Sequence, residues 1–466
     1  MNRTGLLAAA MVAMLAGIAS AQYRTPSYLM GGVASTLSTH WNGVWLADLK
    51  ARSITSLTRG IPVFDIPCLA MDADNRRVVF TADGTQMPGF SSYLQSGVYR
   101  VDPATFQVTT VAAHTLQLFS PTHLLVNPDG DYVLTVRTSL IGAVYNVMKV
   151  SGVGGVLTTV FGISHLPGAE KMNLGINMDT GNYLVTAFRF LGSPQYPHTV
   201  LDVAEDGTWT TFAGATYGWD STGANLQQDF DTGALVGQAD NCLYQLMPGA
   251  ATRTTLAFLP TSARFVLEFG SLFDLQSAAA PRIVASGHVT TLVQGRVCDK
   301  PAVFTIDARP PYACTGINAD PGDQTGCQTN LSRGFGFHLG RHLQTVKIGT
   351  GRWQVHASCP DYPGKAYALV LSARGYRPGI KLPDGRRVHL NLDPLSVLSL
   401  QNLLRPLFDP GPLTLDASGR AAGLIDASSL PPVDVPLWIA LAVLDPQAPC
   451  GLAFLPDTCV MRLRSR

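Results

Sequence analysis

The sequence predicts an all-β protein, a β-propeller followed by a β-sandwich domain, and three observations carry that prediction. A unit of four strand-like segments recurs about every 50 residues through the larger, N-terminal part of the chain. A Gly- and Asp-rich stretch over residues 320–333 then interrupts the pattern. After it, seven or eight short strand-like segments follow within about 125 residues, a density typical of a sandwich.

The repeat is anchored by four aligned aspartates, Asp74, Asp129, Asp179 and Asp231, at separations of 55, 50 and 52 residues. Each lies in a tight Asp/Asn/Gly turn that ends a first strand, and a second, third and fourth strand follow it. We expect these aspartates to bond local backbone, with Gly130 supplying a positive φ. The second strands are expected at 77–81, 132–136, 183–187 and 234–238. The third are expected at 97–102, 143–148, 199–203 and 242–246, and the fourth at 107–111, 156–161, 209–212 and 252–256.

Four strands per unit are typical of a propeller blade, because a single four-stranded sheet cannot bury both of its faces. Residues 265–269, 281–285 and 302–307 form a less regular fifth unit. Strands at 28–33 and 43–48, joined by the segment near 312–317, would complete a ring of six blades. Five or seven blades, and an array of sandwiches with chance spacing, stay open as alternatives.

The domain boundaries follow from these segments. They place a signal peptide at 1–21, the propeller at 22–318, a linker at 319–342 and the sandwich at 343–466. Residues 334–340 are interpreted as a glycine-rich strand at the domain join. In the sandwich we expect strands at 343–348, 353–357, 366–372, 379–385, 387–392, 411–415, 421–425 and 459–463, with an apolar run at 435–444.

The N-terminus has the pattern of a secretory signal peptide: Arg3, an apolar run over residues 6–18, and a small-x-small site ending at Ala21. We expect cleavage before Gln22 and a secreted protein, extracellular or periplasmic. The 33 basic and 32 acidic residues nearly cancel, which argues against nucleic acid as a partner. No later segment predicts a membrane span, and we expect a monomer.

Eight cysteines without a C-x-x-C spacing suit an oxidising compartment and exclude zinc ribbons. Short loops favour disulfides between Cys314 and Cys327 and between Cys450 and Cys459. Cys68 and Cys242 lie in apolar strand patterns, which favour buried thiols.

Two resemblances emerge from these residues. The strand, Asp/Asn-x-Asp-Gly turn, strand unit, as in residues 126–133, resembles secreted six-bladed propellers of the NHL and gluconolactonase-like superfamily. Residues 366–372, 379–383, 392–394, 415–420 and 443–446 resemble the β-sandwich tail of secreted planctomycete and myxobacterial proteins. The first resemblance implies a ligand site at one mouth of the propeller channel, and the second implies an extracellular module.

Loops that enter the inner strands would line that mouth and carry the candidate ligand-binding residues. These are Asp65, His123, Glu170, Asn173, Asp220, Asn225 and Glu268. In the gluconolactonase-like relatives, a Glu, an Asn and an Asp from different blades hold a divalent ion, usually calcium. The resemblance therefore implies Glu170, Asn173 and Asp220 as metal ligands, whose hard oxygen donors suit calcium. Residues 127–131 begin like a calcium loop, but Tyr132 replaces the required Gly, so a plain β-turn is expected.

No nucleophile elbow, zinc-protease helix, P-loop or dinucleotide fingerprint occurs in the chain. The sequence therefore favours a secreted binding or scaffold protein, which presents a polar channel mouth to an extracellular protein, polysaccharide or small ligand. The alternative is a calcium-dependent, lactonase-like hydrolase or lyase. A third hypothesis is a sugar-binding module that uses the aromatic residues Trp41, Tyr217 and Trp219.

Overall fold

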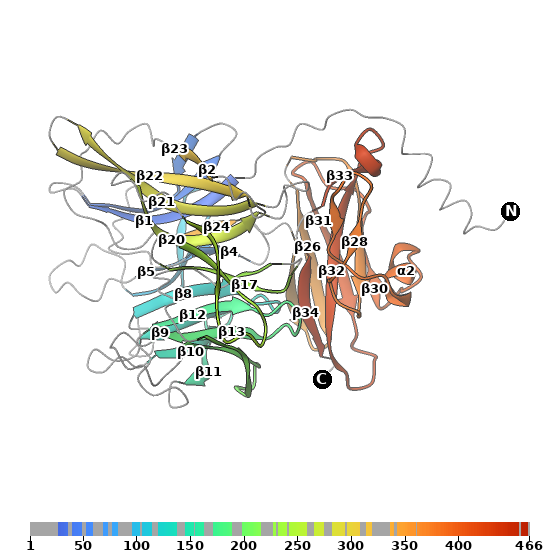
Figure 1. The fold of residues 1–466 in the computed structure, drawn as a ribbon. Helices are drawn as coiled ribbons and strands as arrows, with labels where there is room; N and C mark the ends of the chain where they lie inside the picture. Colours follow the sequence, from blue (N-terminus) through green and yellow to red (C-terminus); the bar gives the residue numbers. More distant parts are fainter. Residues whose placement is uncertain are drawn as a thin grey trace.

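The chain forms six four-stranded antiparallel sheets between residues 27 and 339, and two packed sheets between residues 343 and 464 (Figure 1). The computed structural model describes residues 27–464 apart from connecting segments, of which the longer ones are 59–68, 83–95, 114–119, 138–144, 163–170, 189–197, 216–226, 259–264, 275–281, 308–313 and 319–335. Among the described residues, no helix has the length and apolar character needed to cross a membrane. The predicted signal peptide lies outside the described residues.

The first three sheets follow one another along the chain. The first joins β24 (Gly336–Leu339) to β1 (Ser27–Ser35), β2 (His40–Asp48) and β3 (Ser53–Ser56). The second holds β4 (Leu69–Met71), β5 (Val78–Ala82), β6 (Gly97–Val101) and β7 (Val108–Ala112). The third holds β8 (Ser120–Val126), β9 (Tyr132–Arg137), β10 (Tyr145–Val150) and β11 (Leu157–Gly162).

The remaining three sheets repeat this order. The fourth holds β12 (Lys171–Ile176), β13 (Tyr183–Phe188), β14 (His198–Val203) and β15 (Trp209–Ala215). The fifth holds β16 (Gln227–Gln228), β17 (Leu235–Ala239), β18 (Cys242–Leu246) and β19 (Thr254–Phe258). The sixth holds β20 (Phe265–Asp274), β21 (Arg282–Val293), β22 (Arg296–Asp307) and β23 (Cys314–Asn318).

These sheets close into a six-bladed propeller. The innermost strands β24, β4, β8, β12 and β16 contact one another in that order, β17 adjoins β20, and β20 returns to β24. The ring closes through β24, which pairs with β1, so one blade combines the two ends of the propeller segment. Six blades agree with the sequence prediction, and strands lie at most of the predicted positions.

The prediction of the closing segment was wrong. Cys314–Asn318 form β23, the outermost strand of the sixth blade, and pair with β22 instead of closing the ring. The closing strand lies in the glycine-rich stretch at 334–340, within the range predicted as a linker. Only pairing across the whole ring distinguishes these two short strands, because both are compatible with local strand patterns.

Apolar cores between adjacent blades explain the stacking. One core joins Val44 and Leu57 of the first blade to Phe80 of the second, and a further core joins Val133 of the third to Leu201 of the fourth. Strand β5 is buried throughout, whereas the outer strand β7 is partly or fully exposed over all but its last residue. Among the described residues, cores join the first five blades in sequence, so the second, third and fourth blades are covered on both faces, as the repeat predicted.

The C-terminal part is a β-sandwich. One sheet orders β25 (Leu343–Gly349), β26 (Arg352–Ser358), β31 (Arg420–Asp426) and β30 (Phe408–Asp409). The other orders β27 (Ala366–Ser372), β32 (Asp434–Leu444) and β33 (Leu452–Phe454), with β34 (Cys459–Arg464) also paired to β32. A single core joins the two sheets, including Trp353 and Ile425 from the first and Leu369 and Leu441 from the second.

Three features of the sandwich differ from the prediction. Residues 411–415 form only an isolated bridge between Thr414 and Ala366, because Leu413 has a positive φ of 60° and Pro412 precedes it. The strands expected at 379–392 shrink to the two-residue β28 (Ile380–Lys381) and β29 (Arg387–Val388). Helix α2 (Pro394–Leu400) was missed, although Asp393 and Ser396 form its capping box and Pro394 begins it.

Candidate functional site

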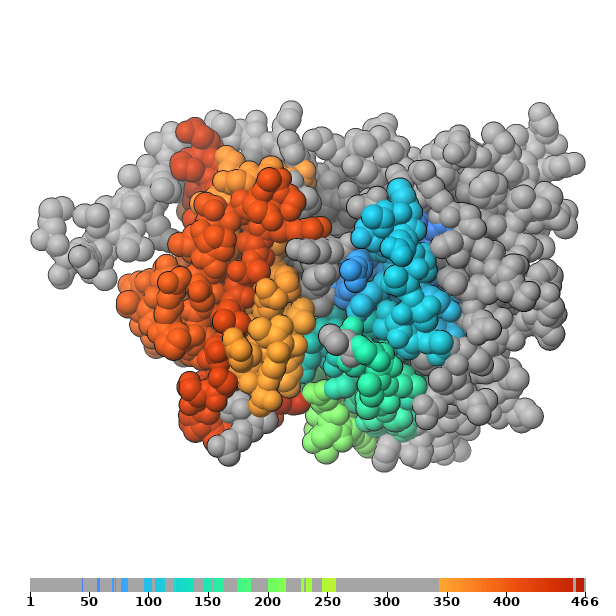
Figure 2. All heavy atoms as spheres, turned by 180° about the vertical axis from the view of Figure 1, so that it is seen from behind, coloured from blue at the N-terminus to red at the C-terminus, as the bar shows by residue number. Residues whose placement is uncertain are grey.

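The inner strands have two ends with different environments. Strand β8 runs from Ser120 to Val126 and is about 20 Å long, so its entry end and the turn after it lie on opposite faces of the propeller. The predicted mouth residues belong to the entry end. The sandwich lies at the other end, against the turns that follow β8, β12 and β16 and the turn between β14 and β15 (Figure 2). We call these four turns the docking face.

The structure tests little of the predicted mouth. Asp65, Glu170, Asp220 and Asn225 lie outside the described residues, as do Tyr217 and Trp219. The backbone places Asn173 in β12 and Glu268 in β20, both innermost strands, and places Trp41 in β2. Glu268 lies between Val266 and Phe269, where the register of β20 shifts. The ligand and calcium roles of these residues therefore stay predictions.

His123 is the one mouth residue whose side chain is described. It is 3% exposed in β8, and its Nδ1 lies 3.1 Å from Oγ1 of Thr135 on the paired strand β9. This contact orients the ring inside the blade, which suits a structural histidine better than a ligand at an open mouth.

The prediction of a Cys450–Cys459 disulfide was wrong, because the structure holds both residues as thiols. Leu452, two residues after Cys450, is paired with Leu444 of β32, whereas Cys459 is paired with Ile439. These two partners are five residues apart, or about 17 Å along the strand. A disulfide requires its Cα atoms to be within about 7 Å. Cys314 begins β23 and Cys327 lies outside the described residues, so that pair stays a prediction.

In the third and fourth blades, the local turn bonds come from asparagines two residues before the aligned Asp129 and Asp179. Oδ1 of Asn127 accepts bonds from the backbone N–H groups of Asp129 (3.0 Å) and Asp131 (2.8 Å). Asn127 also donates through Nδ2 to the hydroxyl of Tyr183 in the next blade, at 3.0 Å. Asn177 accepts in the same way from the backbone N–H of Asp179, at 2.9 Å. The plain β-turn is confirmed, as is the positive φ of Gly130, at 83°.

The side chain of Asp129 bonds the sandwich instead of its own turn, so the predicted local role was wrong. Its Oδ1 accepts a hydrogen bond from Nε1 of Trp353, at 3.0 Å, and its carbonyl accepts from the backbone N–H of Lys347, also at 3.0 Å. The hydroxyl of Thr345 donates to the carbonyl of Pro128, at 2.6 Å. Burial raises the pKa of the Asp129 carboxyl, while the Trp353 bond and the Lys347 charge oppose that rise.

Asp179 makes the equivalent contact in the next blade. Nη2 of Arg377 lies 2.8 Å from both carboxylate oxygens of Asp179, and Nη1 donates to the carbonyl of Thr232, at 2.6 Å. Gly233 leaves the space for this guanidinium, because a Cβ there would lie 2.0 Å from Nη1. Trp438 donates through Nε1 to the carbonyl of Met178, at 2.7 Å. The sandwich thus contacts consecutive blades at equivalent turns.

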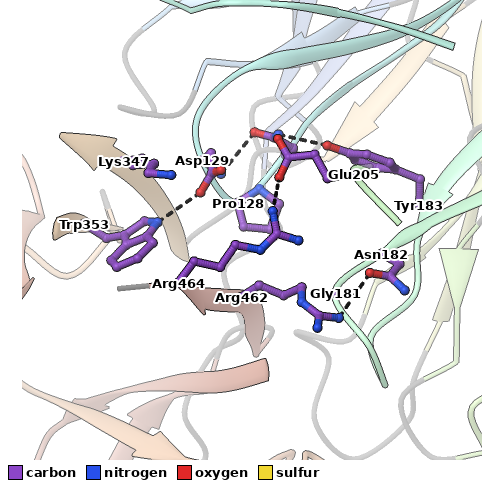
Figure 3. A pocket seen from close by; sticks show the side chains of 11 residues that line it. Pro128, Asp129, Gly181, Asn182, Tyr183, Glu205, Lys347, Trp353, Arg462 and Arg464 are labelled. Atoms are coloured by element: carbon purple, nitrogen blue, oxygen red, sulfur yellow. Dashed lines mark hydrogen bonds and ion pairs between the residues drawn. The ribbon is translucent and has the colours of Figure 1, made fainter. Parts of the chain in front are cut away.

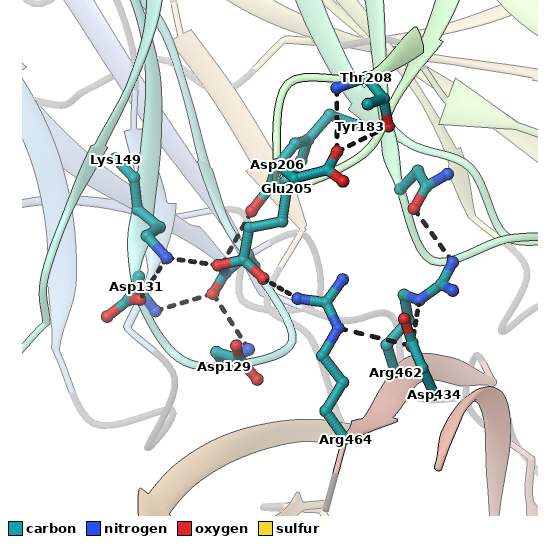
Figure 4. Close-up of polar contacts among 12 residues, drawn as sticks. Asp129, Asp131, Lys149, Tyr183, Glu205, Asp206, Thr208, Asp434, Arg462 and Arg464 are labelled. Atoms are coloured by element: carbon teal, nitrogen blue, oxygen red, sulfur yellow. Dashed lines mark hydrogen bonds and ion pairs between the residues drawn. The ribbon is translucent and has the colours of Figure 1, made fainter. Parts of the chain in front are cut away.

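A chain of charges continues the docking face (Figure 4). Glu205 accepts from Lys149 and from Nη1 of Arg464, the latter at 2.5 Å. Arg464 also faces Asp434, which Arg462 contacts at 2.8 Å. Burial alone would raise the pKa of Glu205, but the hydrogen bonds and charges of Lys149 and Arg464 lower it below the usual value.

A pocket lies within this interface, between Asp129, Glu205, Trp353, Arg462 and Arg464 (Figure 3). Its cavity volume of about 30 Å³ is room for one or two waters, far below the size of a substrate pocket. Among the described residues, no group of three His, Cys, Asp or Glu side chains could hold a metal ion. The described interface therefore carries the contacts of domain docking.

The sequence contains one signal for this interface that the repeat alone does not reveal. Asp129 and Asp179 recur at equivalent turns, but Asn127 and Asn177 already supply the turn bonds, which leaves the aspartates available for another partner. Their partners Trp353 and Arg377 lie 224 and 198 residues later in the chain. No local pattern identifies contacts of that separation.

Comparisons with known proteins add little. No family model matches the chain, and no curated protein matches it. Among solved structures, a protein from Lactobacillus plantarum is 14% identical, with a TM-score of 0.36 over 72% of this chain and 93% of that one. A putative 6-phosphogluconolactonase from Bacteroides uniformis is 11% identical, with a TM-score of 0.37 over 72% and 90%. An oligogalacturonate lyase in complex with manganese is 15% identical, with a TM-score of 0.34 over 58% and 84%. Likenesses at this level establish no shared activity, so the fold rests on the closed ring of six four-stranded blades and the sandwich docked to its turns.

Proposed function

We propose that this protein is a secreted binding protein that presents the entry end of its propeller channel to an extracellular protein, polysaccharide or small ligand. The observation that supports this most is the position of the sandwich. It is attached to the docking face through Asp129, Asp179 and Glu205, at the turn end of the inner strands. The mouth predicted from the sequence would lie at the opposite end of those strands, away from the attachment.

The rigidity of the attachment supports a scaffold role for the sandwich. Arg377 contacts both carboxylate oxygens of Asp179, and the indole of Trp353 donates to Asp129. The chain of charges around Glu205 adds a third contact. Contacts on neighbouring blades constrain rotation of the sandwich about any single contact. The propeller would therefore offer its mouth in a fixed orientation relative to whatever the sandwich contacts.

A calcium ion at the mouth fits the donor chemistry. Glu170, Asn173 and Asp220 would supply carboxylate and amide oxygens, the donors calcium prefers, and Asn173 belongs to an innermost strand. A bound ion would act as a Lewis acid if the protein were the alternative, a lactonase-like hydrolase or lyase. The chain's own residues would then hold and orient the ligand. Binding of a ligand without its turnover distinguishes a binding protein from a lactonase-like enzyme.

The test uses the chain from Gln22 to Arg466, Glu170→Gln at the mouth, and Asp206→Asn as a matched control. Asp206 is a surface carboxylate in a turn on the docking face, so its change leaves the mouth untouched. Each protein is titrated calorimetrically with CaCl₂ and with soluble neutral and acidic polysaccharides, and is assayed for hydrolysis of simple lactones.

The proposal expects polysaccharide or calcium binding that Glu170→Gln loses and Asp206→Asn keeps, without lactone turnover. Calcium-dependent turnover lost in Glu170→Gln would establish the enzyme instead. Binding that Asp206→Asn loses and Glu170→Gln keeps would contradict a site at the mouth.

A further inference from the structure

Helix α2 is oriented with its polar side chains inward. Ser396 and Ser399 are 0% and 2% exposed, whereas Val397, Leu398 and Leu400 are 46%, 37% and 47% exposed. The buried serines have bonding roles: Ser396 belongs to the capping box with Asp393, and Oγ of Ser399 accepts from the backbone N–H of Leu371, at 3.2 Å. Leu395 packs partly against the sandwich core, but the buried serines also bond the sandwich, and Val397, Leu398 and Leu400 are left to solvent, unlike the apolar side of an ordinary surface helix.

The apolar side extends beyond the helix. Leu392 before it and Leu403 after it are 53% and 64% exposed. We call Leu392, Val397, Leu398, Leu400 and Leu403 the α2 patch. Among the described residues, these five lie within 12 positions of sequence, although large exposed apolar side chains number eleven in all. A concentration of this kind marks an interaction surface, whereas scattered apolar residues need no explanation.

The patch carries no net charge. Between residues 392 and 404, the only charged residue is Asp393, which is buried as the cap of α2. Arg405 follows, and its Nη2 lies 2.9 Å from Oδ1 of Asp409, so the two charges beside the patch are opposite and paired. A lipid-binding helix would carry several basic residues on its rim, and a patch for a charged partner would carry the complementary sign.

The area of the patch suits a copy of itself. The exposed parts of its five side chains amount to roughly 400 Å², and the exposed flanks at Pro394, Gln401 and Pro406 enlarge the same face. The five side chains of two such faces would bury about 800 Å², and the exposed flanks bring the total towards the roughly 1,000 Å² at the lower end of specific protein interfaces. In a dimer with a two-fold axis, the same patch of each copy contacts that of the other. An uncharged patch can do so without electrostatic repulsion.

We propose that the α2 patch is a homodimer interface, and that the occupant of the patch is a second copy of this chain. This goes beyond the proposed function, which assigns no role to α2, and it replaces the expectation of a monomer. Figure 1 shows α2 on the side of the sandwich away from the propeller, so a second copy can approach without meeting the docking face or the channel. The dimer would carry two propeller mouths and would bind a multivalent partner more tightly than one copy.

The test is sedimentation equilibrium of the chain from Gln22 to Arg466 over about 1 to 100 µM, the range expected for a small apolar interface. Leu400→Glu and Leu403→Glu each place a charge in the patch. Both should weaken dimerisation by about tenfold or more, because the charge would be desolvated without a partner. Val156→Glu is the matched control, since Val156 is 63% exposed but belongs to the propeller. It should leave the dimer unchanged.

Circular dichroism melting curves establish that each variant is folded. If Leu400→Glu fails to fold, Leu403→Glu, outside the helix, carries the test. Three results would overturn the proposal. One is a monomer at every concentration, and another is equal weakening by Val156→Glu. The third is a monomer that co-floats with phosphatidylglycerol vesicles in a patch-dependent way, which would make the patch a lipid surface.

Discussion

Replacing Trp353 by Phe should uncouple the sandwich from the third blade, and the structure sets the size of the effect. The indole Nε1 donates to Oδ1 of Asp129 at 3.0 Å, and Trp353 is fully buried. Phe keeps an aromatic ring in the core and removes the donor together with part of the indole's volume, a loss that Trp438→Phe shares. A hydrogen bond to a charged group contributes about 1.5–3 kcal/mol, so the variant should lose about 2 kcal/mol of unfolding free energy from this bond.

The loss should depend on pH with a definite sign. The bond stabilises the ionised carboxylate, so removing it raises the folded-state pKa of Asp129 further above the usual value. The cost of Trp353→Phe is therefore greatest where Asp129 is ionised, and it should shrink as the pH falls through that raised pKa. Trp438→Phe is the matched control, because its indole donates to the neutral carbonyl of Met178 and its cost should be independent of pH.

The assay is urea unfolding of Trp353→Phe, Asp129→Ala and the double variant, at neutral and acidic pH. A bond between the two residues predicts a coupling free energy of about 1.5–3 kcal/mol. If the two changes are additive, Asp129 acts within its own turn and the interface reasoning is refuted. Equal pH profiles for Trp353→Phe and Trp438→Phe would refute the assignment of the effect to the carboxylate.

Three further outcomes are expected. Asn127→Ala should cost about 2 kcal/mol in urea unfolding, because it removes both the turn bonds and the bond to the next blade; a cost near zero would contradict this role. Gly233→Ala should destabilise much more than Gly249→Ala, since both have φ near +74° but only the first places a Cβ against Arg377, and equal melting temperatures would contradict the clash. The lowered pKa of Glu205 predicts stability that is present above about pH 4.5 and is lost on further acidification. Glu205→Gln should flatten that loss in melting curves recorded from pH 3 to 7, and an unchanged slope would contradict it.

Local pattern was enough to predict the elements of the propeller. The strand–turn–strand repeat predicted Tyr132–Arg137 and Tyr183–Phe188 within one residue of their observed ends, because alternation and Gly-containing turns are properties of short segments. The same reasoning missed α2, since its capping box interrupts an otherwise strand-like domain. It also assigned ring closure to β23, because β23 and β24 are equally strand-like when each is considered alone.

The sequence by itself determined the all-β class, the six four-stranded units and the positive φ at Gly130, because each depends on residues within a few positions of one another. The tertiary structure alone decided which strand closes the ring and which side chain meets Asp129. It also decided that Cys450 and Cys459 are separated along β32 and that α2 turns its leucines outward. These depend on pairings between segments up to about 300 residues apart. Their contact energies are decided by three-dimensional proximity, which periodicity and spacing do not encode.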